Sequence, residues 1–282
     1  MAAESASSRR ILIVDDDRAL RHAVSALLVA AGHHTESAGD GPDALALLRN
    51  RPFDIVLLDI GLPSMSGLDV LTDLRALPAP PRVIMMTADD TPQSVLEAVR
   101  RQVYRYVRKP FPPKTIVEVV DEAVAAADHS FEVISARPEW LELVAPCTIE
   151  MADRIHSFVM HLEARLPEDV REAVAQAFRE LLMNAVEWGG KLDPNRTVRI
   201  ACVRTKRMLL YRIADPGMGF DIDGLRHAAI SNPEHDPIRH LVVREEKGLR
   251  PGGFGLAMTR SLVDELIYNE ARNEVIFVKY LE

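Results

Sequence analysis

Short aliphatic runs, each followed at once by polar residues, alternate with helical segments through the first half of the chain. The clearest runs are Ile11–Val14, Ile55–Leu58, Val83–Met86 and Val103–Val107. Strands of a parallel sheet are covered by helices on both faces, so they read as continuous apolar runs and not as alternating patterns. The pattern therefore predicts an α/β domain with a five-stranded parallel sheet over residues 1–128.

Polar side chains stand where these strands end. Asp15 and Asp16 follow the first run, Asp59 follows Ile55–Leu58, Thr87 follows Val83–Met86, and Lys109 follows the last run. In open parallel sheets the functional site lies beyond the carboxyl ends of the strands. We therefore expect these side chains to converge on one edge of the sheet, although they are far apart in the sequence.

The chemistry of this set favours phosphoryl transfer. Adjacent carboxylates repel one another, and a hard divalent cation such as Mg²⁺ relieves that repulsion. Thr87 can donate a hydrogen bond to a phosphoryl oxygen, and Lys109 can offset its charge. Asp59 can then act as a nucleophile and form an acyl phosphate. The alternative is a structural network of ion pairs at the edge of the sheet.

These residues resemble the receiver domain of response regulators. The matching segments are Ile11–Asp17, Ile55–Asp59, Pro63–Gly67, Met86–Ala88 and Lys109–Phe111. The resemblance implies Mg²⁺ on Asp15, Asp16, Asp59 and the carbonyl of Gly61, a sensor histidine kinase as phosphodonor, and a cis Lys109–Pro110 bond. It also implies that Thr87 and Tyr106 couple phosphorylation to a change at the surface. One departure is Gln102, which stands where the family often has glycine.

The second half of the chain has a different pattern. Residues 129–137 are interpreted as a linker, and residues 138–282 as a second domain. Strands are expected at Trp140–Val144, Val198–Val203, Met208–Ala214 and Glu274–Tyr280, and helices at about Ile149–Arg165, Pro167–Trp188 and Phe254–Ile267. Helices and antiparallel strands that are segregated in this way predict an α+β sandwich.

Three motifs of the second half suit a nucleotide. Glu180 and Asn184 are four residues apart and share one face of a helix. An Asp-Pro-Gly-Met-Gly sequence, residues 215–219, follows a strand, and Gly252-Gly253-Phe254-Gly255 opens a helix. Glycines at the start of a helix let backbone N–H groups approach phosphate oxygens. The alternative is a glycine-rich domain without a ligand.

Together these motifs resemble the Bergerat ATP-binding fold, and among its families most closely the anti-sigma serine/threonine kinases. Trp140–Leu143, Phe178–Ala185, Ser261–Glu265 and Asn273–Val275 carry that resemblance. It implies ATP and Mg²⁺ as cofactors and a lid at 220–250. The implied roles are a general base for Glu180, Mg²⁺ on Asn184, and nucleotide contacts from Asp215, Gly217, Gly219, Gly253 and Gly255. The implied partners are an anti-sigma-factor antagonist and a sigma factor.

Two other functions stay open for this domain. It could bind ATP and sequester a partner without catalysis, or it could be a histidine-kinase-like ATPase that phosphorylates His156 or His161. Residues 1–128 hold 14 basic and 18 acidic residues and the remainder holds 20 and 24, so each half carries −4 of the net charge of −8. Neither half has a basic excess, so direct DNA binding is not expected.

The cysteine content and the apolar runs indicate in which compartment of the cell the protein is expected. The two cysteines, Cys147 and Cys202, form no CxxC pair, which fits a reducing cytoplasm. No apolar run reaches the roughly 20 residues that span a bilayer, so no membrane segment is expected. A homodimer is an open possibility, because either domain could associate with a second copy.

Overall fold

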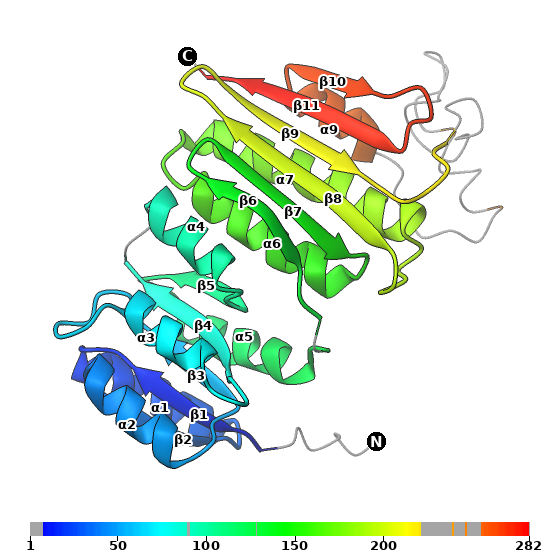
Figure 1. Cartoon of the computed structure of the whole chain (residues 1–282). Coiled ribbons are helices and arrows are strands. Elements are labelled where there is room, and N and C mark those ends of the chain that lie inside the picture. Colours follow the sequence, from blue (N-terminus) through cyan, green and yellow to red (C-terminus); the bar gives the residue numbers. More distant parts are fainter. Residues whose placement is uncertain are drawn as a thin grey trace. The chain divides into compact units, whose positions relative to one another are not determined.

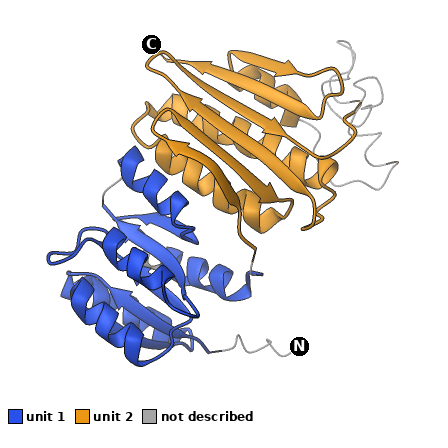
Figure 2. Ribbon diagram, in the orientation of Figure 1, with its two compact units in different colours: residues 1–128 blue, residues 129–282 orange. Residues whose placement is uncertain are grey.

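The computed structural model describes residues 8–88, 91–127, 129–220, 239, 246 and 255–281. The chain divides into two compact units, residues 1–128 and 129–282, which Figure 2 colours separately. The boundary falls at the expected end of the first domain. The two units are described in turn.

Unit 1 is a five-stranded parallel sheet with the strand order β2-β1-β3-β4-β5, as expected (Figure 1). Its strands are β1 (Arg10–Val14), β2 (His34–Ala38), β3 (Ile55–Leu58), β4 (Arg82–Thr87) and β5 (Arg105–Arg108). β3 is buried along its whole length, which is why it reads as an uninterrupted aliphatic run. β2 has the sequence HTESA and is mostly part-exposed at the edge of the sheet, so no aliphatic run marks it.

Four helices connect these strands, and a fifth follows the last strand. They are α1 (Arg18–Ala30), α2 (Gly41–Asn50), α3 (Gly67–Arg75), α4 (Pro92–Arg100) and α5 (Pro113–Ala125). Four of them begin at a residue whose side chain accepts a backbone N–H of the first turn: Asp17, Asp40, Ser66 and Thr91. Such caps satisfy N–H groups that have no partner within the helix. The helices that follow β1 to β4 are therefore fixed close to the ends of those strands, whereas α5 has no side-chain cap.

Two backbone features of unit 1 concern positions that the sequence had marked. The Lys109–Pro110 bond is cis, as the resemblance implied. Gln102 has a φ of +56°, in the left-handed region that favours glycine. The structure thus gives a reason for the family's glycine at this position, and Gln102 adopts the same conformation with a side chain.

Unit 2 is a six-stranded antiparallel sheet with the order β10-β11-β9-β8-β7-β6. Its strands are β6 (Glu132–Arg137), β7 (Trp140–Pro146), β8 (Thr197–Arg204), β9 (Met208–Ala214), β10 (Glu265–Tyr268) and β11 (Glu274–Tyr280). The helices α6 (Ile149–Leu162), α7 (Glu168–Asn184) and α9 (Gly255–Leu262) lie along one face of the sheet (Figure 1). Phe178 of α7 contacts Tyr211 of β9, and Tyr211 stacks on Phe277 of β11. The expected α+β sandwich is confirmed.

Three parts of unit 2 differ from the sequence predictions. The expected linker at residues 129–137 contains β6, which pairs with β7 and forms an edge of the sheet. The helix expected to reach Ile267 ends at Leu262, and Glu265–Tyr268 form β10. Asp264 marks this change, because its side chain accepts the backbone N–H of Tyr280. Beyond Asn184, a π-helical turn at Ala185–Gly189, labelled η1, extends α7.

Candidate functional site

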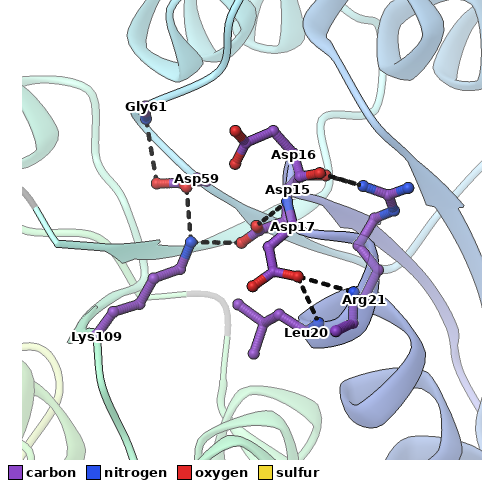
Figure 3. Close-up of polar contacts among 9 residues, drawn as sticks. Asp15, Asp16, Asp17, Leu20, Arg21, Asp59, Gly61 and Lys109 are labelled. Carbon is purple, nitrogen blue, oxygen red and sulfur yellow. Dashed lines mark hydrogen bonds and ion pairs between the residues drawn. The ribbon is translucent and has the colours of Figure 1, made fainter.

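Three carboxylates meet at the carboxyl ends of β1 and β3. Oxygen atoms of Asp15, Asp16 and Asp59 lie within 4.8 Å of one another (Figure 3). Asp15 is fully buried, Asp59 is 6% exposed, and Asp16 is exposed. The strand ends are joined directly, because the backbone N–H of Asp59 donates to the carbonyl of Val14. The structure thus brings together the acidic residues that the sequence placed at strand ends.

Lys109 lies between two of these carboxylates. Its Nζ is 2.6 Å from Oδ2 of Asp59 and 2.6 Å from Oδ2 of Asp15 (Figure 3). Its backbone N–H donates to the carbonyl of Thr87, which ties the end of β5 to the end of β4. Thr87 is 2% exposed. All the residues predicted for this site therefore lie at one edge of the sheet.

The charges of the cluster change the pKa of two of its members. Burial raises the pKa of the Asp15 carboxyl above its usual value, although the nearby ammonium group of Lys109 opposes that shift. Burial lowers the pKa of Lys109, but the contacts with Asp15 and Asp59 outweigh it, and the pKa of Lys109 is raised. Lys109 contacts only two of the three carboxylates that meet here. A close cluster of carboxylate oxygens of this kind fits Mg²⁺.

The backbone around Asp59 leaves no room for a side chain at Gly67. A Cβ atom at Gly67 would lie 1.9 Å from the carbonyl oxygen of Asp59, so only glycine fits there. Gly61 is less crowded, and its N–H donates to Oδ1 of Asp59 at 3.1 Å. Tyr106, on the edge strand β5, is 1% exposed. The close contact between Gly67 and Asp59 fixes the start of α3 against the site.

In unit 2, the side chains expected to bind nucleotide come from separate elements. Glu180 and Asn184 lie on α7, and both are partly exposed. A Cβ atom at Gly255, the first residue of α9, would lie 2.3 Å from Oε2 of Glu180. Glu180 therefore lies against the amino end of α9, where backbone N–H groups could approach an anion. Gly253 and most of the expected lid at 220–250 lie outside the described residues.

The loop after β9 presents Asp215 beside two glycines. The N–H of Gly217 donates to Oδ1 of Asp215 at 2.7 Å. A Cβ atom at Gly189 would lie 2.1 Å from the same oxygen, so Gly189 makes room for the carboxylate. Gly219 has a φ of +82°, a conformation that favours glycine. Burial raises the pKa of Asp215, and the bond from Gly217 opposes that shift.

Several residues that support the two sites were not assigned a role from the sequence. In unit 1, Arg21 donates to the carbonyls of Asp15 and Asp16. In unit 2, Arg196 donates to the carbonyl of Pro216 at 2.6 Å, and Asn273 donates to the carbonyl of Gly217 at 2.9 Å. In each of these contacts a side chain donates to a backbone carbonyl that the fold brings near. Because no sequence spacing encodes them, only the structure could reveal them.

The two histidines of the open alternative contact protein groups. Nε2 of His156 is 3.1 Å from the carbonyl of Ala175, and its ring stacks on Phe178. Nδ1 of His161 is 2.7 Å from the carbonyl of Ser157 on the same helix. These contacts favour the interpretation that both residues contribute to the packing of α6.

No helix in the described part of the chain is both long enough and apolar enough to cross a membrane.

Comparisons with known proteins match the two units separately. Residues 11–121 match the response regulator receiver domain family, and residues 146–279 match the histidine kinase-like ATPase domain family. The ATPase match covers Glu180, Asn184 and Asp215, and implies that this unit binds ATP. The receiver match covers Asp15, Asp16, Asp59, Thr87 and Lys109.

Individual relatives agree with the first match. The DNA-binding response regulator MtrA of Mycolicibacterium smegmatis is 40% identical over 210 residues, covering 74% of this chain and 90% of MtrA. Chemotaxis protein CheY-3 of Vibrio cholerae is 38% identical over 120 residues, covering 40% of this chain and 89% of CheY-3. The chain spans only 47% of MtrA of Mycobacterium tuberculosis, at 39% identity.

A solved structure is similar as well. A CheY-like receiver domain protein from Methanospirillum hungatei is 30% identical, with a TM-score of 0.41, and covers 42% of this chain and 94% of that one. The chain thus belongs to the response regulators, and it joins a receiver domain to a histidine kinase-like ATPase domain.

Proposed function

We propose that Asp59 accepts a phosphoryl group from a sensor histidine kinase, and that this controls an ATP-dependent serine/threonine kinase in unit 2. The observation that carries the proposal is the position of Lys109, 2.6 Å from both Asp59 and Asp15, in a cluster of three carboxylates. A nucleophilic carboxylate beside a fixed ammonium group is suited to form and hold an acyl phosphate.

The first step is a transfer between two proteins. Oδ of Asp59 attacks the phosphorus of the donor's phosphohistidine, the P–N bond breaks, and its electron pair stays on the imidazole. Asp15, Asp16, Asp59 and the carbonyl of Gly61 would hold Mg²⁺, which supplies positive charge for the phosphoryl oxygens. The ammonium group of Lys109 then pairs with the new phosphoryl group in place of the Asp59 carboxylate. Thr87 donates its hydroxyl to a phosphoryl oxygen, and that shift is passed to Tyr106.

The second step belongs to unit 2. Asp215 accepts a hydrogen bond from the amino group of adenine, and Gly217, Gly219 and Gly255 lie next to the nucleotide. The resemblance assigns the same role to Gly253, which lies outside the described residues. Asn184 would hold the Mg²⁺ that accompanies ATP. Glu180 removes the proton from a serine or threonine hydroxyl of the partner, and that oxygen attacks the γ-phosphorus while ADP leaves. The position of Glu180 against the amino end of α9 supports this role.

The partners follow from the resemblance to anti-sigma kinases. We propose a small anti-sigma-factor antagonist as the substrate and a sigma factor as the protein whose binding is switched. The relatives named MtrA are DNA-binding regulators, but here residues 146–279 match an ATPase domain. A protein that binds ATP and sequesters its partner without catalysis is the second candidate. It is supported by the same nucleotide site, with no requirement for Glu180 as a base.

The test uses the full chain with Mg²⁺, radiolabelled ATP and candidate antagonists. We expect acid-stable phosphoserine on the antagonist, and we expect Glu180→Ala to abolish it. Glu172→Ala, on the exposed side of the same helix, is the matched control and should retain activity. ATP binding without any phosphoserine would establish the sequestering function. Acid-labile phosphate on His156 or His161 would indicate a histidine-kinase-like ATPase.

A further inference from the structure

Asn273 holds the Asp215 loop at both ends. The backbone N–H of Asp215 donates to the carbonyl of Asn273 at 2.8 Å, and Nδ2 of Asn273 donates to the carbonyl of Gly217 at 2.9 Å. Asn273 precedes β11, whereas the loop follows β9, and these two strands are paired. One residue of the neighbouring strand therefore fixes the position of Asp215-Pro216-Gly217 through two hydrogen bonds.

The side chain of Asn273 is itself held in place. Its Oδ1 accepts a hydrogen bond from Nδ2 of Asn269 at 2.8 Å, and its backbone N–H donates to Oδ1 of Asn269 at 3.1 Å. This arrangement defines which end of the Asn273 amide is the donor, so that Nδ2 faces the carbonyl of Gly217. On the other side of the loop, Arg196 donates to the carbonyl of Pro216. The backbone N–H of Asp215 and the carbonyls of Pro216 and Gly217 thus each have a hydrogen-bond partner outside the loop.

The same contacts orient the carboxylate of Asp215. Oδ1 accepts the N–H of Gly217, whereas no donor from the described residues reaches Oδ2. The carboxylate is only partly exposed, and its raised pKa reflects that burial. A fixed acceptor with one uncommitted oxygen is suited to a single N–H donor of a ligand.

A carboxylate alone does not distinguish adenine from guanine. Adenine presents an amino donor at the position where guanine presents the carbonyl acceptor O6. If the carboxylate could shift, it could accept the N–H groups of guanine's other ring edge instead. Selection for adenine therefore requires that Asp215 cannot move, because a fixed acceptor that faces O6 is left without a donor.

We propose that Asn273 is a positioning residue that makes the nucleotide site of unit 2 select adenine over guanine, by holding the Asp215 loop at both ends. This inference rests on the proposed nucleotide-binding function and adds the residue that sets base selectivity. Asn273 does not touch the base, and it acts only through the position of Asp215. Any residue at this position keeps the carbonyl that accepts the N–H of Asp215, so substitution removes only the side-chain bond to Gly217. Its loss should therefore affect the base and leave the phosphate contacts unchanged.

The experiment measures the dissociation constants of ATP and GTP, with Mg²⁺, for the full chain. Asn273→Asp keeps the size of the side chain and its acceptor oxygen, but it replaces the donor to Gly217 with a second oxygen. Asn273→Ala removes the side chain altogether. In the unchanged protein we expect the dissociation constant of GTP to be about 100 times that of ATP, which is the GTP-to-ATP ratio used below. Both variants should lower that ratio about tenfold, mainly through weaker binding of ATP.

Two controls separate positioning from general stability. Arg212→Ala removes a bidentate ion pair with Glu274 across the same strand pair, and it should lower the melting temperature without changing the ratio. Inorganic triphosphate should compete equally well in every variant. An unchanged ratio in a folded Asn273→Asp protein would overturn the inference while ATP binding stands. If the unchanged protein binds neither nucleotide, the proposed function and the inference both fall.

Discussion

In unit 1, three carboxylates gather around the ammonium group of Lys109, whereas in unit 2 Asp215 and Glu180 stand on separate elements beside glycines. Among the described residues, Lys109 has no counterpart that pairs with Asp215 or Glu180. The site of unit 1 contains the ammonium group of Lys109 and suits a phosphoryl group, which can replace Asp59 as the partner of that ammonium group. The site of unit 2 is formed mainly by backbone and glycines, and it suits a larger ligand such as a nucleotide with its bound Mg²⁺.

The two sites also differ in the elements of secondary structure that build them. The residues of unit 1 all follow adjacent parallel strands, so the sheet alone brings them together. The site of unit 2 needs one helix, one loop and the start of a second helix. The receiver site should therefore depend on charge balance, and the nucleotide site on the exact path of the backbone.

The largest expected effect is the loss of acyl phosphate in Asp59→Asn. The amide has no nucleophilic oxygen anion, so a small-molecule phosphodonor or a sensor kinase should label the unchanged protein and not the variant. Phosphate-affinity electrophoresis provides the measurement. Asp69→Asn, an exposed carboxylate at the start of α3, is the control and should be labelled normally. Labelling of Asp59→Asn at another residue would show that the cluster does not act through Asp59.

Gly67→Ala should destabilise unit 1 by about 3 kcal/mol, because its Cβ overlaps the carbonyl of Asp59 and the backbone must move. Urea unfolding measures this change. Gly61→Ala is the matched control, since its Cβ would lie 3.8 Å from the nearest atom of Asp59, and its stability should be close to that of the unchanged protein. Equal losses in both variants would mean that crowding against Asp59 does not matter.

Lys109→Ala should lower the free energy of unfolding by about 2 kcal/mol without Mg²⁺, because Asp15 and Asp59 lose the cation that they share. Excess Mg²⁺ should restore much of the loss. The comparison is with Lys114→Ala, whose side chain is 85% exposed and pairs with Glu118 on the same helix. If Mg²⁺ has no effect on Lys109→Ala, the charge-balance account of this site is wrong.

The smallest effect concerns Asp15→Asn. Burial raises the folded pKa of Asp15 above its unfolded value, so the folded state favours the protonated form. Ionisation of Asp15 therefore costs stability as the pH rises from the unfolded pKa through the folded one. Without Mg²⁺, Asp15→Asn should be more stable than the unchanged protein at pH 7, and this advantage should vanish below about pH 4.

Unfolding curves measured from pH 3 to pH 8, with a chelator to remove Mg²⁺, would show whether Asp15→Asn is more stable than the unchanged protein at pH 7. The same variant should bind Mg²⁺ about tenfold or more weakly, because one carboxylate ligand is replaced by a neutral amide. A variant that is less stable at pH 7 would indicate that the ion pair with Lys109 outweighs the burial of Asp15.

Sequence reasoning located the receiver site because its residues stand at or just after the carboxyl ends of strands, and three of these strands are almost entirely buried. It could not locate β2, whose HTESA sequence lies at the edge of the sheet. It interpreted β6 as linker because this edge strand lies directly after the boundary between the units. It extended α9 into β10, since an apolar segment of four residues does not distinguish a helix from a strand.

In unit 2, the motifs predicted which residues would bind the nucleotide, and that role stays a prediction. The motifs did not indicate what holds these residues in place. Glu180, Asn184 and Asp215 stand in recognisable spacings along the chain. Gly189 directly follows the helix expected at Pro167–Trp188 and was given no role in the site, yet it makes room for Asp215. Asn273 and Arg196 act through backbone carbonyls that the sheet brings near, and such contacts have no fixed separation in sequence.

We propose that phosphorylation of Asp59 changes the rate of the ATP-dependent transfer that unit 2 is proposed to catalyse. The most direct measurement is the rate of γ-phosphate transfer from ATP to an antagonist, with and without beryllium trifluoride, a mimic of the phosphoryl group on Asp59. The account predicts that the mimic changes the rate about fivefold or more, and that Asp59→Asn does not respond. Equal rates with and without the mimic in the unchanged protein would contradict it.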